Sequence, residues 1–166
     1  MFDLKRLNKK AVPRALEKAE RYRLLNEPSE AESICLDILA VDPENQVALV
    51  TLLLALTEQF DDRLSDALHE AREVLPRLEG EYERAYFAGI VCERRAKALL
   101  RHGGPASGYV AYDGLEEAMD WYAKAEALRP AGNDDALLRW NTCARLIERN
   151  PHLVPGPTDG SEPPLE

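Results

Sequence analysis

The sequence predicts an all-α protein, an α-solenoid of about three similar helical pairs followed by a capping helix. Ala, Leu, Glu and Arg dominate the composition while clusters of β-branched residues are few, which favours helix over strand. One helix design occurs three times, at residues 29–43, 65–79 and 116–130. Because a single helical pair cannot bury its apolar face alone, we expect neighbouring pairs to stack.

The repeated design begins with a small residue, which is Ala31, Ala67 or Ala118 in the three copies. Further small or apolar residues follow four and seven positions later, so each set lies on one helical face. Pro43 and Pro130 close the first and third copies at the same offset, because proline cannot continue a helix. The pattern predicts that the three alanines occupy equivalent, buried positions where helices approach closely.

The first four helices are expected at residues 12–25, 30–41, 45–60 and from about 63 to 75, with a short turn at Asp61 and Asp62. Ser29 is a plausible N-cap for the second helix. The third is apolar nearly all round, so it needs cover on several sides.

A long helix at residues 81–101 carries Gly89, which costs about 1 kcal/mol relative to Ala in mid-helix and predicts a closely packed neighbour. Residues 102–113 are expected to form an irregular insertion, because three glycines and a proline stop helix formation. Helices at 114–128 and from about 134 to 149 follow, the last one capped by Asn133 or Asp134. Five prolines and negative charge after residue 149 predict a disordered acidic tail.

Charge and composition exclude several function classes. The net charge of −9 argues against nucleic-acid binding, which depends on neutralising phosphates. Residues 1–25 nevertheless carry eight basic and three acidic side chains, which leaves −14 for the rest of the chain. This basic segment is either a solvated helix face or a contact for an acidic partner or membrane surface.

The cysteines and the apolar segments indicate the expected compartment. The three cysteines form no CxxC pair, so neither a zinc site nor a disulfide framework is expected. The most apolar segment, residues 47–57, is too short to cross a bilayer, so we expect no membrane insertion. The start lacks the apolar run of a secretion signal, and the cytoplasm is the expected location.

No catalytic constellation is recognisable. His69, His102 and His152 lie far apart in the sequence and do not pair at metal spacing. Adjacent acidic residues occur at helix starts, where negative charge favours the helix dipole. The sequence therefore predicts no enzyme activity, no cofactor and no metal site.

Paired helices with this spacing resemble the tetratricopeptide repeat (TPR) family, whose unit is about 34 residues. The resemblance implies a lead-in at 1–11, a TPR-like domain at 12–149 and the tail at 150–166. The units are 12–45, 46–80 and 81–132, with the insertion at 102–113 and a capping helix at 134–149. Tyr22 and Tyr122 are expected to fill gaps between units. An ordinary helical bundle with chance periodicity is the alternative. The matching residues are Ala19, Tyr22, Ala31 and Pro43 in the first copy and Gly89, Ala118, Tyr122, Ala125 and Pro130 in the third.

In the TPR family the first helix of each unit lines a concave groove that holds a peptide or helix. The resemblance implies a groove here with an apolar middle and an acidic rim, suited to a protein segment with apolar anchors and basic flanks. Leu16, Thr51 and Phe87 stand where some relatives carry a polar carboxylate clamp, so no acidic C-terminus is expected to bind. The groove positions carried over by register are Leu16, Glu20, Arg23, Val50, Leu54, Thr57, Glu83, Tyr86, Ile90 and Glu93.

The leading functional hypothesis is a non-catalytic protein-interaction module, an adaptor or scaffold. The alternative is a structural subunit that forms a homodimer and buries the same apolar face. The remote third alternative is an enzyme. For the groove itself the alternative to an open surface is self-burial, with Val50, Leu54 and Ile90 covered by the insertion or by the last helix of the same chain.

Overall fold

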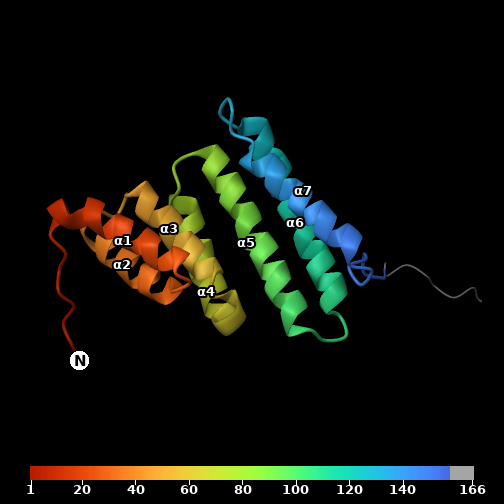
Figure 1. Ribbon diagram of the computed structural model, residues 1–166, viewed down its shortest axis with the longest axis horizontal. Helices are drawn as coiled ribbons and strands as arrows, with labels where there is room; N and C mark the ends of the chain where they lie inside the picture. Colours follow the sequence, from red (N-terminus) through yellow and green to blue (C-terminus); the bar gives the residue numbers. More distant parts are fainter. Residues whose placement is uncertain (158–166) are drawn as a thin grey trace, which may run out of the picture.

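The structure, a computed structural model, describes residues 1–157, and this part of the chain is helical with no strand (Figure 1). The predicted all-α class is confirmed. Two short 3-10 helices, η1 (Lys9–Ala11) and η2 (Leu75–Arg77), flank or extend the α-helices. The α-helices are α1 (Val12–Leu24), α2 (Pro28–Val41), α3 (Gln46–Thr57), α4 (Phe60–Val74), α5 (Glu81–His102), α6 (Ser107–Leu128) and α7 (Asp135–Arg149).

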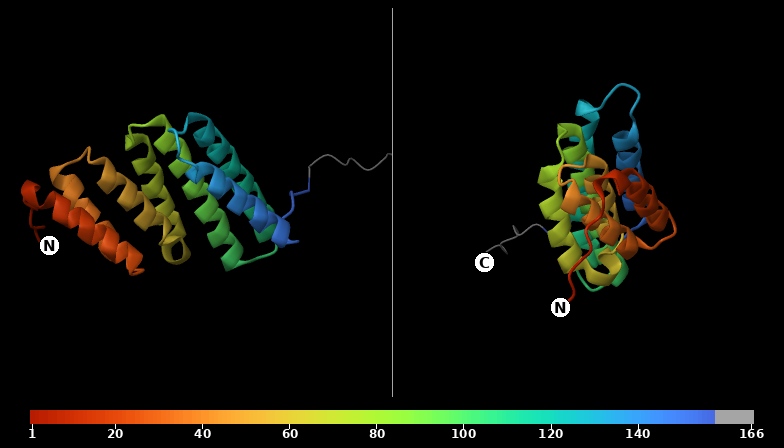
Figure 2. Two further views of the ribbon diagram at one scale, coloured as in Figure 1. Left: turned by 45° about the horizontal axis from the view of Figure 1, so that its top comes forward. Right: turned by 90° about the vertical axis from the view of Figure 1, so that its left-hand side faces the viewer.

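The helices follow one another along the long axis of the molecule, with α1 at one end and α6 and α7 at the other (Figures 1 and 2). Each helix packs chiefly against the helices next to it in the chain, and the odd-numbered helices α1, α3 and α5 also contact one another. This order matches the predicted stack of helical pairs, a helical-repeat-like fold. The stack brings side chains of successive pairs onto shared surfaces.

Capping side chains fix two of the helix starts. Asn45 Oδ1 accepts a hydrogen bond from the Ala48 backbone N–H at 2.9 Å, which satisfies a free donor at the start of α3. Asn133 Oδ1 accepts from the Asp135 N–H at 3.0 Å before α7, as expected. The expectation for Ser29 is wrong, because α2 already begins at Pro28, a residue suited to the first turn.

The turn expected at Asp61 and Asp62 is a kink inside α4. Arg63 has φ −146° and ψ 56°, far from helical values, and the helix resumes after it. Its guanidinium donates to Glu32 of α2 at 2.8 Å and to Glu70 of α4 at 2.9 Å. These bonds hold the kinked segment against the neighbouring hairpin.

The interior consists of two apolar clusters. The first, here called the amino-terminal core, lies among α1 to α4 and one side of α5 and contains large aliphatic and aromatic side chains such as Ile38, Leu49, Leu53 and Phe60. The second, the carboxy-terminal core, lies among α5 to α7 and is built mainly from alanines, with Tyr122 as its largest member. Phe87 of α5 packs against both, so the two clusters meet at that helix.

The small residues of the repeated design lie where the pattern places them. Ala31, Ala67 and Ala118 are each 0% exposed, so all three are buried on the second helix of their pair. At Gly89 an added Cβ would lie 2.5 Å from Cε1 of Tyr122, which is the close approach that this glycine predicts. Tyr22 differs from expectation, because it is 36% exposed and fills no gap between units.

The insertion expected at residues 102–113 is mostly helix, so that prediction is wrong. Helix α6 begins at Ser107, and only residues 103–106 separate it from α5. Gly103 and Gly104 have φ of 73° and 114°, conformations that glycine adopts without strain. Two glycines thus make a short turn, and α5 and α6 form a hairpin of two 22-residue helices.

The first part of the expected tail packs on the protein. Leu153 is buried in the carboxy-terminal core, so the expectation of disorder is wrong at this position. Tyr109, which belongs to the expected insertion, lies near this segment, since a Cβ on Gly156 would be 3.7 Å from the Tyr109 Cβ. The remainder of the predicted tail, residues 158–166, lies outside the described residues.

Candidate functional site

Polar side chains link the odd-numbered helices across one face of the stack. Arg23 of α1 donates through Nε to Glu58 Oε1, at the end of α3, over 2.8 Å. Arg94 of α5 donates through Nη1 to the Thr57 hydroxyl oxygen at 2.6 Å and lies 3.6 Å from Glu58 Oε1. Glu58 therefore receives cations from two different helices and ties α1, α3 and α5 together.

A second polar group, around Glu93, joins α5 to the last two helices. The Glu93 side chain is fully buried, and its carboxylate accepts hydrogen bonds from Lys97 Nζ and from the Tyr122 hydroxyl. Arg139 of α7 places its Nε 3.5 Å from Glu93 Oε2. A buried carboxylate is tolerated only when it is paired and hydrogen-bonded, and here three helices supply the partners.

These groups surround a pocket of about 310 Å³ between the end of α3, α5 and α7. Four of its eight residues are basic and three are acidic, so its surface is polar and slightly positive in a chain with net charge −9. It is large enough to receive a side chain of a bound segment. The lining residues are Thr57, Glu58, Asp61, Glu93, Arg94, Lys97, Arg101 and Arg139.

Two of the guanidinium groups in this pocket have unusual surroundings. Burial lowers the pKa of Arg94, although Glu58 offsets part of the effect. Arg139 Nε is buried and has no hydrogen-bond partner within the described part of the chain. A buried donor without an acceptor costs about 1–3 kcal/mol. The Glu93 carboxylate, 3.5 Å away, offsets part of this cost through its charge, and the Arg139 side chain as a whole is 29% exposed to solvent.

The structure brings some of the predicted groove residues into this polar face. Arg23, Thr57 and Glu93 belong to the two polar groups, and Glu20 pairs with Arg23 at 2.9 Å. Thr57 and Glu93 are buried, so they do not offer surface to a partner protein directly. They instead hold the side chains of Arg94 and Lys97 in place.

The apolar groove residues lie mostly inside the molecule. Ile90 is buried in the carboxy-terminal core, so it is not an accessible anchor. Leu16, Val50 and Leu54 pack against the cores and are only partly exposed. Tyr86 stacks on Tyr82 with ring centroids 5.8 Å apart. The predicted apolar middle is therefore largely covered by the chain itself, without the insertion.

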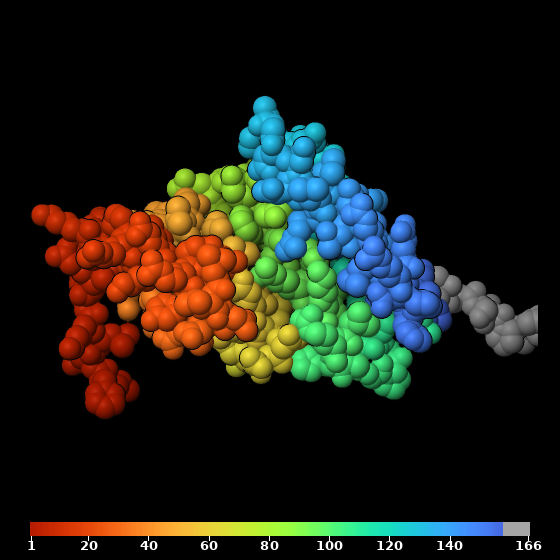
Figure 3. Space-filling view, viewed as in Figure 1, coloured from red at the N-terminus to blue at the C-terminus, as the bar shows by residue number. Residues whose placement is uncertain are grey.

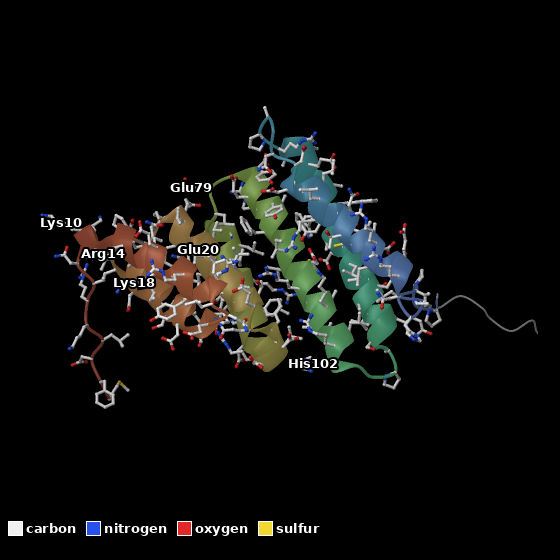
Figure 4. The ribbon with its side chains drawn as sticks, in the orientation of Figure 1. Lys10, Arg14, Lys18, Glu20, Glu79 and His102 are labelled. Atoms are coloured by element: carbon white, nitrogen blue, oxygen red, sulfur yellow. The ribbon has the colours of Figure 1, made fainter. Side chains whose placement is uncertain are left out.

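Glu83, a predicted rim residue, is exposed, as is Glu20, which Figure 4 labels on α1. The residues that sequence reasoning missed are basic ones inside the pocket. Arg94, Lys97 and Arg101 recur three and four positions apart on α5, a spacing that places them on one helical face. This spacing in the sequence is enough to predict a basic face on α5, whereas the approach of Arg139 from α7 depends on tertiary packing.

The cysteines lack the properties of reactive thiols. Burial raises the pKa of Cys35, Cys92 and Cys143 to about 12 in each case. A thiol needs its ionised form to act as a nucleophile or metal ligand, and these thiols remain protonated at neutral pH.

Searches within residues 1–157 bear on two further classes of site. That range holds no group of three or more His, Cys, Asp or Glu side chains placed to bind a metal ion. None of its helices is both long enough and apolar enough to cross a membrane. Comparison of the chain with family models, curated proteins and solved structures found no match. The TPR resemblance therefore rests on the residues of this chain alone.

Proposed function

We propose that the protein is a non-catalytic interaction module, a TPR-like adaptor or scaffold, which binds a segment of another protein across α1, α3, α5 and α7. The observation that carries this proposal is the polar pocket of about 310 Å³ on a stack of paired helices. Its donors come from different helices, and the side chains of Arg101 and Arg139 are 56% and 29% exposed, so their accessible N–H groups can donate to a bound segment. A bound segment that supplies an acceptor would complete the hydrogen bonding of this face.

The chemistry of the face suggests a partner segment with three features. An Asp, Glu, Asn or Gln side chain would accept hydrogen bonds in the pocket from Arg101 and Arg139. Apolar residues beside it would contact the exposed parts of Leu16 and Tyr86. Basic flanks would meet the exposed carboxylates of Glu20 and Glu83, as the sequence suggested.

A cytoplasmic location is part of this proposal. All three cysteines are free, and the two most deeply buried, Cys35 and Cys143, lie in different cores. Unpaired thiols suit a reducing compartment, where disulfides are rare.

The proposal is tested by selecting binders from a random peptide library displayed on phage, with the purified full chain as bait. The selected peptides should share an acceptor side chain next to apolar residues. Arg101→Glu should weaken their binding tenfold or more, because Arg101 lines the pocket and is largely exposed, so the fold survives its loss.

The matched control is Lys124→Glu, the same charge reversal at an exposed position of α6. It should leave peptide affinity unchanged in fluorescence polarisation titrations. Failure to select any peptide, or equal affinity for the Arg101→Glu variant and the unmodified chain, would refute the pocket as a binding site.

A further inference from the structure

The outer side of the first helix carries a row of cations without ion-pair partners. Lys10, Arg14 and Lys18 are spaced four residues apart and follow one another along η1 and α1 (Figure 4). All three are exposed, and none forms an ion pair with a carboxylate of residues 1–157. Like charges this close repel one another in the isolated chain, so an anionic surface would stabilise them.

The segment before the helix adds charge and apolar area to this surface. Phe2 and Leu4 are 98% and 90% exposed, at the end of the chain that projects from the stack (Figure 1). We call this surface the basic end. It comprises Phe2, Leu4, Lys5, Arg6, Lys9, Lys10, Arg14, Lys18 and Arg21, whose charged members are all exposed.

An oppositely charged surface lies at the other end of the stack. Asp113, Glu116 and Asp120 of α6 follow one another at spacings of three and four, so they share a helical face. They are exposed, and none pairs with a Lys, Arg or His of residues 1–157.

This acidic face includes a small hollow in which two carboxylates lie beside two apolar side chains. Glu116 and Asp120 line a pocket of about 240 Å³ together with Met119 and with Trp140 of α7. The Trp140 ring is partly exposed there. We call this surface, formed by Asp113, Glu116, Met119, Asp120 and Trp140, the acidic end.

We propose that the basic end of one copy of this chain docks onto the acidic end of a second copy. The row of Lys10, Arg14 and Lys18 faces the carboxylates of α6, and the apolar tip carrying Phe2 reaches the hollow at Trp140. The helices that carry the two surfaces, α1 on one side and α6 with α7 on the other, lie toward opposite ends of the long axis (Figures 1 and 3), so the contact is head to tail. Such a contact does not close by itself and allows short chains of copies to form.

The magnitudes of surface electrostatics decide what kind of association this is. Exposed ion pairs contribute about 0–1 kcal/mol each and are screened beyond about 10 Å at 0.1 M salt. The contact is therefore weak and depends on salt. An anionic lipid surface would also attract the basic end, but it would leave the acidic end and Trp140 without a role. A second copy uses both surfaces, which is why we favour it.

The first measurement is sedimentation velocity of the full chain over a wide range of protein concentration, at low and at high salt. The weight-average mass should rise with concentration at low salt and return toward the monomer at high salt. A monomer at every concentration in low salt overturns the proposal. Binding to anionic vesicles without self-association does so as well.

Charge reversal then tests which surfaces are involved. Reversing the basic end with K10E, R14E and K18E, or the acidic end with E116K and D120K, should each lower the association constant tenfold or more. The first variant has two acidic ends and the second has two basic ends, so a mixture of the two should associate again.

This recovery in the mixture separates lost contacts from lost folding, since a misfolded variant would not regain a partner. Reversing Arg145 and Arg149, two exposed cations of α7 outside both surfaces, is the matched control and should change nothing. Failure of the mixture to associate, or a loss with the control as large as with the end variants, would contradict the head-to-tail arrangement.

Discussion

The two cores of this protein are held together by different physical means. The amino-terminal core contains large side chains that exclude water, among them Leu49, Leu53 and Leu56 of α3. The carboxy-terminal core contains few large aliphatic residues, and its helices approach through alanines and Gly89. At the centre of that second half lies a buried carboxylate, Glu93. Both halves use the same helical hairpin, so the hairpin design does not dictate what fills the space between helices.

The difference teaches where specificity lies in each half. Apolar side chains attract one another without direction, so in the amino-terminal half the directional contacts come from ion pairs outside the core, such as Arg23–Glu58 and Arg63–Glu32. A carboxylate that receives Lys97, Tyr122 and Arg139 is satisfied in one arrangement only. Glu93 thereby fixes the position of α7, which supplies one wall of the candidate pocket. The hydrogen bonds and ion pairs around Glu93 thus both position α7 and form part of the candidate pocket.

The largest expected effect comes from removing the charge at the centre of this network. Glu93→Ala should lower the free energy of unfolding by about 3–5 kcal/mol, because it leaves Lys97 and the Tyr122 hydroxyl without their shared acceptor and Arg139 without its countercharge. Urea unfolding followed by circular dichroism measures the loss. Glu93→Gln retains an acceptor and should cost less, and equal losses for the two variants would contradict the role given to the charge.

The corresponding change in the amino-terminal core acts through volume. Leu53 is fully buried in α3, and Leu53→Ala should cost about 2–5 kcal/mol through lost transfer energy and an unfilled cavity. Salt should leave this loss unchanged, since no charge is involved, and urea unfolding at low and high salt checks both points. A loss below about 1 kcal/mol would indicate that the core collapses around the cavity.

The sequence predicts the local helical pattern of this structure better than it predicts the lengths of the connections. The helical class and the burial of Ala31 and Ala118 follow from a spacing of three and four that chemistry imposes locally. The glycines and the proline near Gly103 predict an irregular segment of twelve residues, 102–113. In the structure they interrupt the helix over only four residues, 103–106, and α6 begins at Ser107. Compositional signals identify a break but do not measure its length.

The candidate site was predicted less well, again for a physical reason. Register along α5 places Glu93 on the inner face, but the same register cannot show that Tyr122 and Arg139 arrive from other helices to bury it. Sequence spacing describes one helix at a time. A polar network that spans three helices becomes visible only after their packing is known.

A third prediction sharpens the comparison at the repeated small positions. Ala118 is fully buried in the carboxy-terminal core, and Ala118→Leu should destabilise by about 1–3 kcal/mol through overpacking. Ala123 on the same helix is exposed, so Ala123→Leu serves as the matched control for adding leucine to α6. Chemical denaturation measures both variants, and a neutral Ala118→Leu would contradict close helix approach at this alanine.

The smallest effect concerns the pH dependence of stability, which should reveal the buried Tyr122 hydroxyl of the carboxy-terminal core. Burial, followed by the nearby Glu93 charge, raises the pKa of Tyr122 above its ordinary value. The phenol of an unfolded tyrosine has a pKa of about 10. The stabilisation gained by keeping Tyr122 protonated is therefore complete below that pH and is lost as the pH rises above it. Tyr122→Phe should cost about 1.5 kcal/mol at pH 7 by removing a hydrogen bond to a charged acceptor.

The difference between Tyr122→Phe and the unmodified chain should therefore shrink above about pH 10, where only the unmodified chain loses this stabilisation. The buried thiols do not change this difference in stability, because Cys35 and Cys143 are present in both proteins. Burial raises the pKa of each to about 12. Their contribution is complete below about pH 8.5 and falls as pH rises toward 12, equally in both proteins. Urea unfolding at steps from pH 8 to 11 follows the gap. A gap of constant size across this range would mean that the Tyr122 proton does not contribute to the stability of the carboxy-terminal core.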